Sequence, residues 1–225
     1  MKNASWFRII LLALARIGFA IPLGGTTLYF RRSALVELGG WDAHNVTEDA
    51  NLGIRLARAG YRCTMLDTNT CEEATNAPLS WVQQRSRWIK GCFMTYAVHM
   101  RSPKTLLHDL GLWQFCGFQV VFLPAIFMFL LAPVNWSFWL IALGIVPQES
   151  FGVPAPVLIR LICLYAMAFT LDLRISALGV FKAGHLRLLL WIPSQYYYYP
   201  LATLAAFKAL FEVILAPFYW DKTST

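Results

Sequence analysis

The chain has 225 residues, of which 58% are hydrophobic and only 14% are charged. This composition excludes an ordinary soluble domain and predicts an integral membrane protein. The net charge is +7, but the basic residues are scattered, so we expect a cytoplasmic membrane face or a diphosphate-bearing substrate as the partner, and no nucleic acid. The five cysteines include no C-x-x-C pair, which fits neither a disulfide framework nor a zinc site.

Residues 1–20 contain a short apolar run, Ile9–Ala15, between Arg8 and Arg16. A run of this length is too short to span a bilayer. The apolar side chains fall on one helical stripe, which predicts an amphipathic helix packed on a domain or lying in the membrane interface. Lys2 followed by an apolar run also resembles a signal peptide, and that alternative stays open.

Residues 21–108 have the pattern of a mixed α/β region. Short β-type runs predict strands at Thr26–Phe30 and Tyr61–Leu66. Helical signals predict one or two turns at Ser33–Leu38, a helix from the N-cap Thr47 to Ala59, and a long helix from Ser80 through Met100.

Apolar stretches dominate the rest of the chain, at residues 112–131, 134–147, 155–171 and 188–216. Their succession predicts an all-α transmembrane domain of three or four helices. Residues 134–147 are short and lie between two prolines, so if they do not cross the bilayer the number of spans is three.

Two charged residues lie on or near the third apolar segment, Asp172 and Arg174. Charges are costly in lipid and commonly mark a function there. We therefore expect them either to face a polysaccharide channel or to lie at the bilayer boundary.

The tripeptide Thr47-Glu48-Asp49 places two carboxylates in the first turn of a predicted helix. Unpaired N–H groups and the helix dipole stabilise ionised carboxylates there. Two acids at this position can simply stabilise the helix. Asp49 can also act as a general base that deprotonates an attacking hydroxyl.

A second cluster lies on the long predicted helix. Gln84, Arg87 and Trp88 are spaced so that they share one helical face. An arginine suits a leaving diphosphate, and an indole suits the face of a sugar ring. Without other signals the pattern reads as an Arg/Trp cation–π pair. Arg85 and Lys90 are either additional phosphate contacts or a basic face toward anionic lipid.

The joint order of these motifs is quite specific. Gly-Gly-Thr-Thr (24–27), Leu-Gly-Gly-Trp-Asp (38–42), Thr-Glu-Asp (47–49) and Gln-x-x-Arg-Trp (84–88), followed by membrane spans, resemble family 2 glycosyltransferases of the cellulose-synthase-like group. Residues 21–92 carry the resemblance. It implies an inverting reaction and a GT-A nucleotide-sugar-binding domain attached to membrane helices.

The resemblance also implies roles for individual residues. Asp49 matches the catalytic base of the family, and the Gln-x-x-Arg-Trp residues match those that line the acceptor and diphosphate region. The Gly25-Thr26 region looks like the loop under the acceptor sugar. The expected site therefore consists of the catalytic Asp49 and the substrate-binding residues Gly25, Thr26, Glu48, Gln84, Arg85, Arg87 and Trp88.

Part of the family pattern is missing. No D-D-G, no D-x-D metal motif and no Gly-rich phosphate loop precede Gly24. We therefore expect the Mg²⁺ or Mn²⁺ of the family to be bound by a missing N-terminal region, and this chain to be a C-terminal fragment with little activity alone. Residues 1–108 would be the C-terminal half of the GT-A domain and residues 109–225 the membrane domain.

The expected partners are a nucleotide-sugar donor, a glycan acceptor, the lipid bilayer, and a separate N-terminal half or an export partner. The expected location is the bacterial inner membrane, with the catalytic part in the cytoplasm. Two alternatives remain: a non-catalytic subunit or inactive remnant of a polysaccharide synthase, and a small transporter component. The second alternative requires polar stripes along the spans, and the apolar segments show few.

Overall fold

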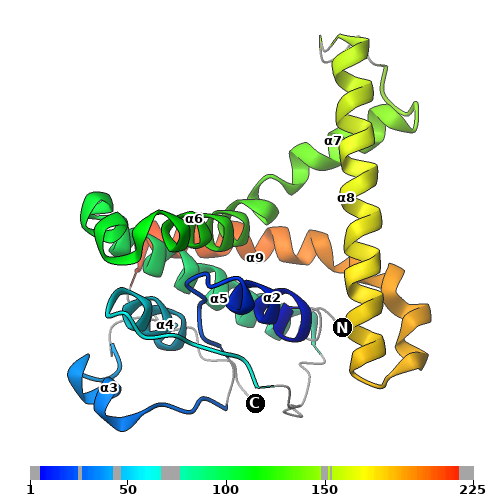
Figure 1. The fold of residues 1–225 in the computed structure, drawn as a ribbon. Coiled ribbons are helices and arrows are strands. Elements are labelled where there is room, and N and C mark those ends of the chain that lie inside the picture. The colour runs from blue at the N-terminus through cyan, green and yellow to red at the C-terminus, as the bar shows by residue number, and fades with distance from the viewer. Residues whose placement is uncertain are drawn as a thin grey trace. The chain divides into compact units, whose positions relative to one another are not determined.

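The computed structural model describes residues 6–24, 27–42, 47–66, 77–147, 152 and 154–217. Every regular element among these residues is a helix (Figure 1). The helices are η1 Trp6–Leu11, α2 Leu12–Arg16, α3 Arg32–Glu37, α4 Glu48–Arg58, α5 Pro78–His99, α6 Pro103–Leu130, α7 Ala132–Ala142, α8 Ala155–Lys182, η3 Leu186–Tyr198 and α9 Tyr199–Leu215. The chain divides into two compact units, residues 1–9 with 130–199, and residues 10–129 with 200–225. The domain boundary expected at residues 108 and 109 stays a prediction.

The two runs for which the sequence predicted strands do not form strands. Residues 27–30 and 61–66 have irregular backbone, and Thr26 lies outside the described residues. A β-strand needs a neighbouring strand to receive its backbone hydrogen bonds, and the described part of the chain contains no strand. The strand predictions are wrong for these residues, and the α/β GT-A class expected for residues 1–108 is unconfirmed.

The three helices predicted between residues 33 and 100 are confirmed as α3, α4 and α5. Their ends differ from the predicted ones by one to three residues, and the largest difference is at the start of α5, where the cap is Ala77 and not the predicted Ser80. α5 begins with Pro78 in its first turn, where the missing N–H of proline costs no helical hydrogen bond. The long α5 therefore presents its candidate site residues on a regular helix.

Helix α4 is packed on two sides within the second unit. Leu52 and Leu56 are buried in a small core together with Ala34 of α3. On another side, Gly53 lies so close to residues 21–23 that a methyl group in place of its hydrogen would come within 2.6 Å of the carbonyl oxygen of Ile21. The segment that leads into Gly24 therefore runs directly against α4.

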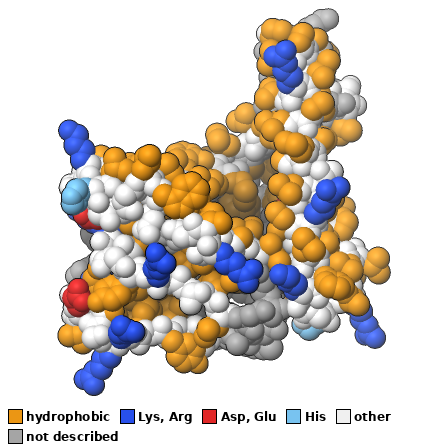
Figure 2. Space-filling model, in the orientation of Figure 1, with side chains coloured by type: hydrophobic (Ala, Val, Ile, Leu, Met, Phe, Trp, Pro, Cys, Tyr) orange, Lys and Arg blue, Asp and Glu red, His pale blue; other side chains and the backbone are white. Residues whose placement is uncertain are grey.

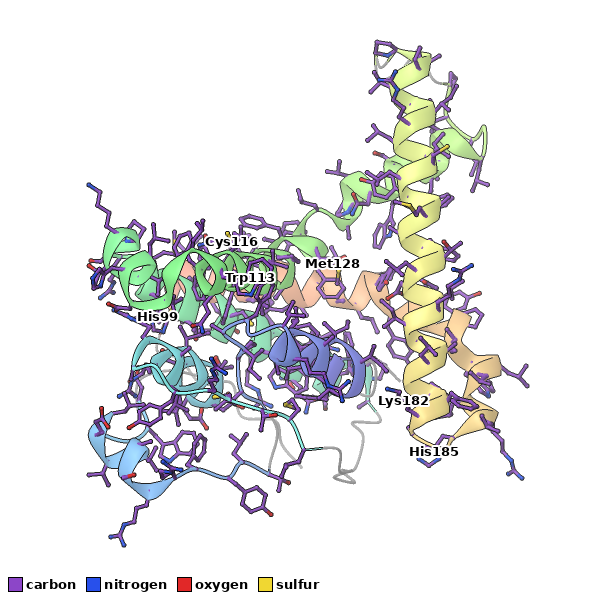
Figure 3. All side chains as sticks on the ribbon, viewed as in Figure 1. His99, Trp113, Cys116, Met128, Lys182 and His185 are labelled. Carbon is purple, nitrogen blue, oxygen red and sulfur yellow. The ribbon has the colours of Figure 1, made fainter. Side chains whose placement is uncertain are left out.

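The start of α6 is bent and packs on the residues that follow α2. Gly111 has φ 69° and ψ 167°, a conformation that residues with a side chain rarely adopt. Beyond the bend, the Trp113 indole donates a hydrogen bond of 2.8 Å to the carbonyl of Ile17 and packs against Phe19 at 4.9 Å between ring centroids (Figure 3). Gly117 faces the same Phe19 ring. The apolar part of α6 is thus attached to the unit that carries α4 and α5.

Three segments among the described residues are long and apolar enough to cross a membrane: Pro103–Leu130, Ala155–Lys182 and Leu186–Leu215. Figure 2 shows hydrophobic side chains over most of the visible face of α8. Helix α7, which covers residues 134–142 of the short apolar stretch predicted at 134–147, is too short to span a bilayer alone. The prediction of a membrane domain is confirmed in its coarse form.

The unit that contains α7, α8 and η3 has a polar face between its helices. Asp172 on α8 accepts hydrogen bonds from Gln195 Nε2 at 3.2 Å and from the Tyr196 hydroxyl at 2.9 Å. Asn135 on α7 accepts a hydrogen bond of 2.6 Å from the Tyr165 hydroxyl. Such bonds between helices compensate the cost of polar groups in lipid. They explain how Asp172 is accommodated, while both expectations for its role stay predictions.

Candidate active site

The N-terminus of α4 carries the candidate base. Thr47 is the N-cap residue, and Glu48 and Asp49 lie in the first turn, as predicted. The Thr47 side chain makes no capping hydrogen bond. Instead, Oδ1 of the half-buried Asp49 accepts the N–H of Ala50 at 2.7 Å. Backbone N–H groups in this turn favour the ionised carboxylate, which is the form that a general base requires.

A glycine on α5 allows the start of α4 to lie against that helix. A methyl group at Gly91 would come within 2.1 Å of Thr47 Cγ2 and within 2.3 Å of its Oγ1, far closer than atoms can approach without movement. Gly91 therefore holds the Thr47–Asp49 turn next to α5, one turn beyond Trp88. The sequence analysis missed this residue, although an isolated glycine within a long predicted helix is a signal for close packing.

The half-buried Cys92 lies on the face of α5 that the candidate base approaches. The pKa of the Cys92 thiol is raised to about 11, mainly by burial and secondarily by the negative charge of Asp49, while Arg85 opposes the shift. Both charged groups therefore lie close enough to Cys92 to affect its titration. Because Cys92 follows Trp88 by four residues, the two share one helical face. Arg85 lies over the Trp88 ring, and the turn that contains Asp49 contacts the same helix at Gly91.

Arg85 lies between two indole rings. Its guanidinium carbon is 5.2 Å from the ring centroid of Trp81 and 5.1 Å from that of Trp88, within the range of cation–π attraction. Burial lowers the pKa of Arg85, although the group remains charged at any ordinary pH. Trp88 is 40% exposed, so its ring is accessible to a ligand. Trp81 was not predicted, although it precedes Arg85 by one helical turn.

The other predicted site residues are placed as follows. Gln84 and Arg87 are half-buried on α5, and Glu48 is half-buried in the first turn of α4. Gly25 and Thr26 lie outside the described residues. The structure thus brings the α4 turn and the α5 cluster together, and the role of each residue stays a prediction.

Side chains of α4 hold the Leu-Gly-Gly-Trp-Asp segment. Arg55 donates to the carbonyl oxygens of Gly40, at 2.8 Å, and of Leu38. Asn51 donates from Nδ2 to Asp42 Oδ2 at 3.1 Å. These contacts fix the segment that contains the exposed Trp41 on the helix whose N-terminus carries Asp49. The sequence analysis found the segment but not the two residues that hold it.

His99, at the end of α5, links α4 to α6 (Figure 3). Its Nε2 lies 2.9 Å from Asn51 Oδ1 and its Nδ1 lies 3.2 Å from the Arg58 guanidinium. Arg58 is also paired with Asp109 of α6 at 2.7 Å. Because Arg58 can only donate, the His99 ring accepts at Nδ1 and donates from Nε2, which is the neutral form. The network fixes the relative position of three helices.

The stability of this unit is expected to depend on pH through His99. Burial, with help from Arg58 and Arg55, lowers the pKa of His99 from 6.5 to about 4. The unfolded chain binds a proton near pH 6.5 and the folded protein only near pH 4. The contribution of neutral His99 is therefore complete above pH 6.5 and is lost as the pH falls toward 4, by about 3 kcal/mol in total.

Thermal unfolding in detergent between pH 7.5 and pH 4 measures this effect. His99→Gln keeps a side chain that can form hydrogen bonds but does not titrate, so its unfolding midpoint should fall less steeply than that of the unmodified protein. His108 is 90% exposed, and His108→Gln should leave the slope unchanged. An unaltered slope in His99→Gln would contradict the assignment.

Comparison of the sequence with models of protein families shows which family the chain belongs to. The model of glycosyl transferase family group 2 matches residues 3–219. The chain belongs to this family. The resemblance found in the Thr-Glu-Asp and Gln-x-x-Arg-Trp motifs is thereby confirmed.

Curated proteins that are similar to part of this chain have related names. The chain is 37% identical over 87 residues to a probable glycosyltransferase of Bacillus subtilis (strain 168), which covers 38% of the chain and 18% of that protein. It is 32% identical over 75 residues to the cellulose synthase 1 catalytic subunit of Komagataeibacter xylinus, covering 33% and 10%. It is 33% identical over 93 residues to a β-monoglucosyldiacylglycerol synthase of Nostoc sp. (strain PCC 7120), covering 40% and 19%. No solved structure matches the chain. The family-2 chain spans less than a fifth of each relative.

The described residues of this chain contain no candidate metal site. Among those residues, no group of three or more His, Cys, Asp or Glu side chains could hold a metal ion. The described residues therefore do not fit the Mg²⁺ or Mn²⁺ that the family resemblance implies, and the expected location of the ligands in an additional N-terminal region stays a prediction.

Proposed function

We propose that the chain transfers a sugar, with inversion, from a nucleotide sugar to a glycan or exopolysaccharide acceptor at the bacterial inner membrane. It does so together with an N-terminal nucleotide-binding half that supplies the D-D-G and D-x-D motifs and the divalent metal. The observation that carries the proposal is the contact of the Asp49 turn with α5 at Gly91, on the helix that presents Arg85 and the exposed Trp88.

The proposed chemistry is a single displacement. The acceptor hydroxyl oxygen attacks the anomeric carbon while its proton passes to the Asp49 carboxylate. The bond from the anomeric carbon to the donor phosphate breaks, and the nucleoside diphosphate leaves with the electron pair. Arg87 stabilises the negative charge on the leaving group, and the Trp88 ring packs under the acceptor sugar.

The nature of the acceptor is the finer part of the proposal. The names of the relatives include a polymer synthase and a glycolipid synthase, so an assay must detect both products. Membranes that contain the chain and the N-terminal half are incubated with radiolabelled uridine- and guanosine-diphosphate sugars. The proposal expects label in an insoluble polymer or oligosaccharide fraction. Label only in the organic-solvent extract would identify a lipid acceptor.

The role of Trp88 is testable in the same assay. Trp88→Ala is expected to raise the KM for the acceptor by about fivefold, because stacking on an aromatic ring contributes on the order of 1 kcal/mol. Trp88→Phe keeps a flat ring and should retain most of the affinity. Trp191 is also exposed, at 63%, and Trp191→Ala serves as the matched control without an effect on KM.

The competing proposal is a non-catalytic membrane subunit or an inactive remnant of a polysaccharide synthase. It expects no transfer with any donor, even when the N-terminal half is present. Transfer that requires both parts would exclude it, and transfer by the N-terminal half alone would exclude the catalytic proposal.

A further inference from the structure

Lys90 on α5 contacts a segment far away in the sequence. Its side chain is completely buried, which corrects the expectation that it faces phosphate or lipid. Nζ donates a hydrogen bond of 2.8 Å to the carbonyl oxygen of Ala216 and lies 3.6 Å from Glu212 Oε2. Glu212 lies in the last turn of α9, where it is also paired with Lys208, and Ala216 directly follows the helix.

The contact of the Lys90 ammonium group with Glu212 and Ala216 anchors the end of α9 to α5. A buried ammonium group is costly unless it is paired and hydrogen-bonded. The last carbonyl groups of a helix have no partner within the helix and carry the negative end of its dipole. Ala216 N–H completes the final turn of α9 by bonding to Glu212 O at 2.9 Å, and the carbonyl of Ala216 accepts from Lys90. The ammonium group thus meets a carboxylate and a helix end together.

The same contact constrains how the chain crosses the membrane. Ala216 lies at the surface of α5, so the end of α9 must be on the membrane side that holds α5. The loop after α8 carries Lys182, His185 and Arg187, all exposed, and Figure 3 shows the first two at one end of α8. Positive charge places this loop in the cytoplasm. Arg101 and Lys104, between α5 and the apolar part of α6, place α5 in the cytoplasm by the same rule. The segment Leu186–Leu215 then begins and ends on the same side.

We propose that Leu186–Leu215 does not cross the bilayer. We also propose that Lys90 is a positioning residue that ties the end of this segment to α5, the helix of the Gln-x-x-Arg-Trp motif. The chain then crosses an even number of times between α5 and Ala216, with α6 and α8 as the crossings. Pro193 and Pro200 interrupt the segment, as expected for one that turns back or lies in the interface. The positioning role rests on the proposed function, whereas the crossing pattern does not.

Reporter fusions to the complete chain test the crossing pattern. Green fluorescent protein fused after Thr225 should fluoresce, because it folds in the cytoplasm, and alkaline phosphatase fused at the same point should be inactive. A fusion inserted into the loop after α7, between residues 147 and 154, should give the opposite result. An active phosphatase after Thr225 would overturn the proposal.

Variants of Lys90 test the anchor. Hydrogen–deuterium exchange in detergent should rise at least tenfold in peptides from the second half of α5 and the end of α9 in Lys90→Met, and should not change in α8. Glu212→Gln, a milder change, should give the same pattern with a smaller increase. Lys208→Met is the matched control, since Lys208 pairs with the same carboxylate but lies on α9 itself. An equal response in Lys208→Met, or none in Lys90→Met, would refute the anchor.

Transfer kinetics test the positioning role separately. Lys90→Met should lower kcat at least tenfold and leave nucleotide-sugar binding unchanged, while Lys90→Arg, which keeps a cationic donor, should recover part of the rate. Unchanged kcat in Lys90→Met, with increased exchange, would refute positioning. If the unmodified protein transfers no sugar but the exchange and reporter results are as expected, the proposed function alone is wrong.

Discussion

Asp49→Asn is expected to lower the rate of sugar transfer by a factor of about 10²–10⁴, because general-base catalysis contributes on this scale. Asparagine has nearly the same shape, and its amide oxygen can still accept the Ala50 N–H that Asp49 Oδ1 binds. It cannot take up the proton of the acceptor hydroxyl. Initial rates with a radiolabelled donor measure the loss, and equilibrium dialysis should show that the donor still binds.

Two carboxylate variants make this test specific. Glu37 accepts a hydrogen bond from the Tyr61 hydroxyl at 2.5 Å and lies outside the proposed site, so Glu37→Gln removes one negative charge without an expected change in rate. Glu48→Gln alters a proposed substrate contact beside the base and should affect KM more than kcat. Turnover by Asp49→Asn at the rate of the unmodified protein would remove the assignment of the base.

Local signals made the helices of the site predictable. Thr47 as an N-cap, two acids in the next turn and the long run after Ser80 all depend on residues close in sequence. The predicted strands at residues 26–30 and 61–66 depend instead on a pairing partner, and side-chain preference alone does not supply one. Pattern reading therefore placed the motifs on the correct helices but could not establish the fold class.

The contacts that assemble the site were not predictable from spacing. Gly91 against Thr47, His99 between Asn51 and Arg58, and Lys90 against Ala216 each join residues that are distant in sequence. Lys90 illustrates the reason. A lysine beside a cluster of arginines and indoles reads as a surface charge, and only the path of α9 shows that its ammonium group is enclosed.

Gly91→Ala is expected to separate α4 from α5 and to lower both stability and activity. The added methyl group would overlap the Thr47 side chain, which is β-branched and has little rotational freedom. Overpacking of this kind costs about 1–3 kcal/mol, partly offset by the roughly 1 kcal/mol that alanine gains over glycine in a helix. Misplacement of a catalytic group by about 1 Å can cost roughly 10²-fold in rate. We therefore expect the loss of kcat, expressed as an activation free energy, to exceed the loss in free energy of unfolding.

A second substitution at the same contact separates crowding from other effects. Thr47→Gly removes the three side-chain atoms that lie nearest to the methyl group added by Gly91→Ala, and glycine at an N-cap costs only a few tenths of a kcal/mol. The double variant should therefore recover most of the unfolding midpoint and part of kcat that Gly91→Ala alone loses. Additive losses in the double variant would show that the Gly91–Thr47 contact does not set the position of Asp49. Recovery would tie the base to α5 by direct packing, because the second change relieves the same collision that the first one creates.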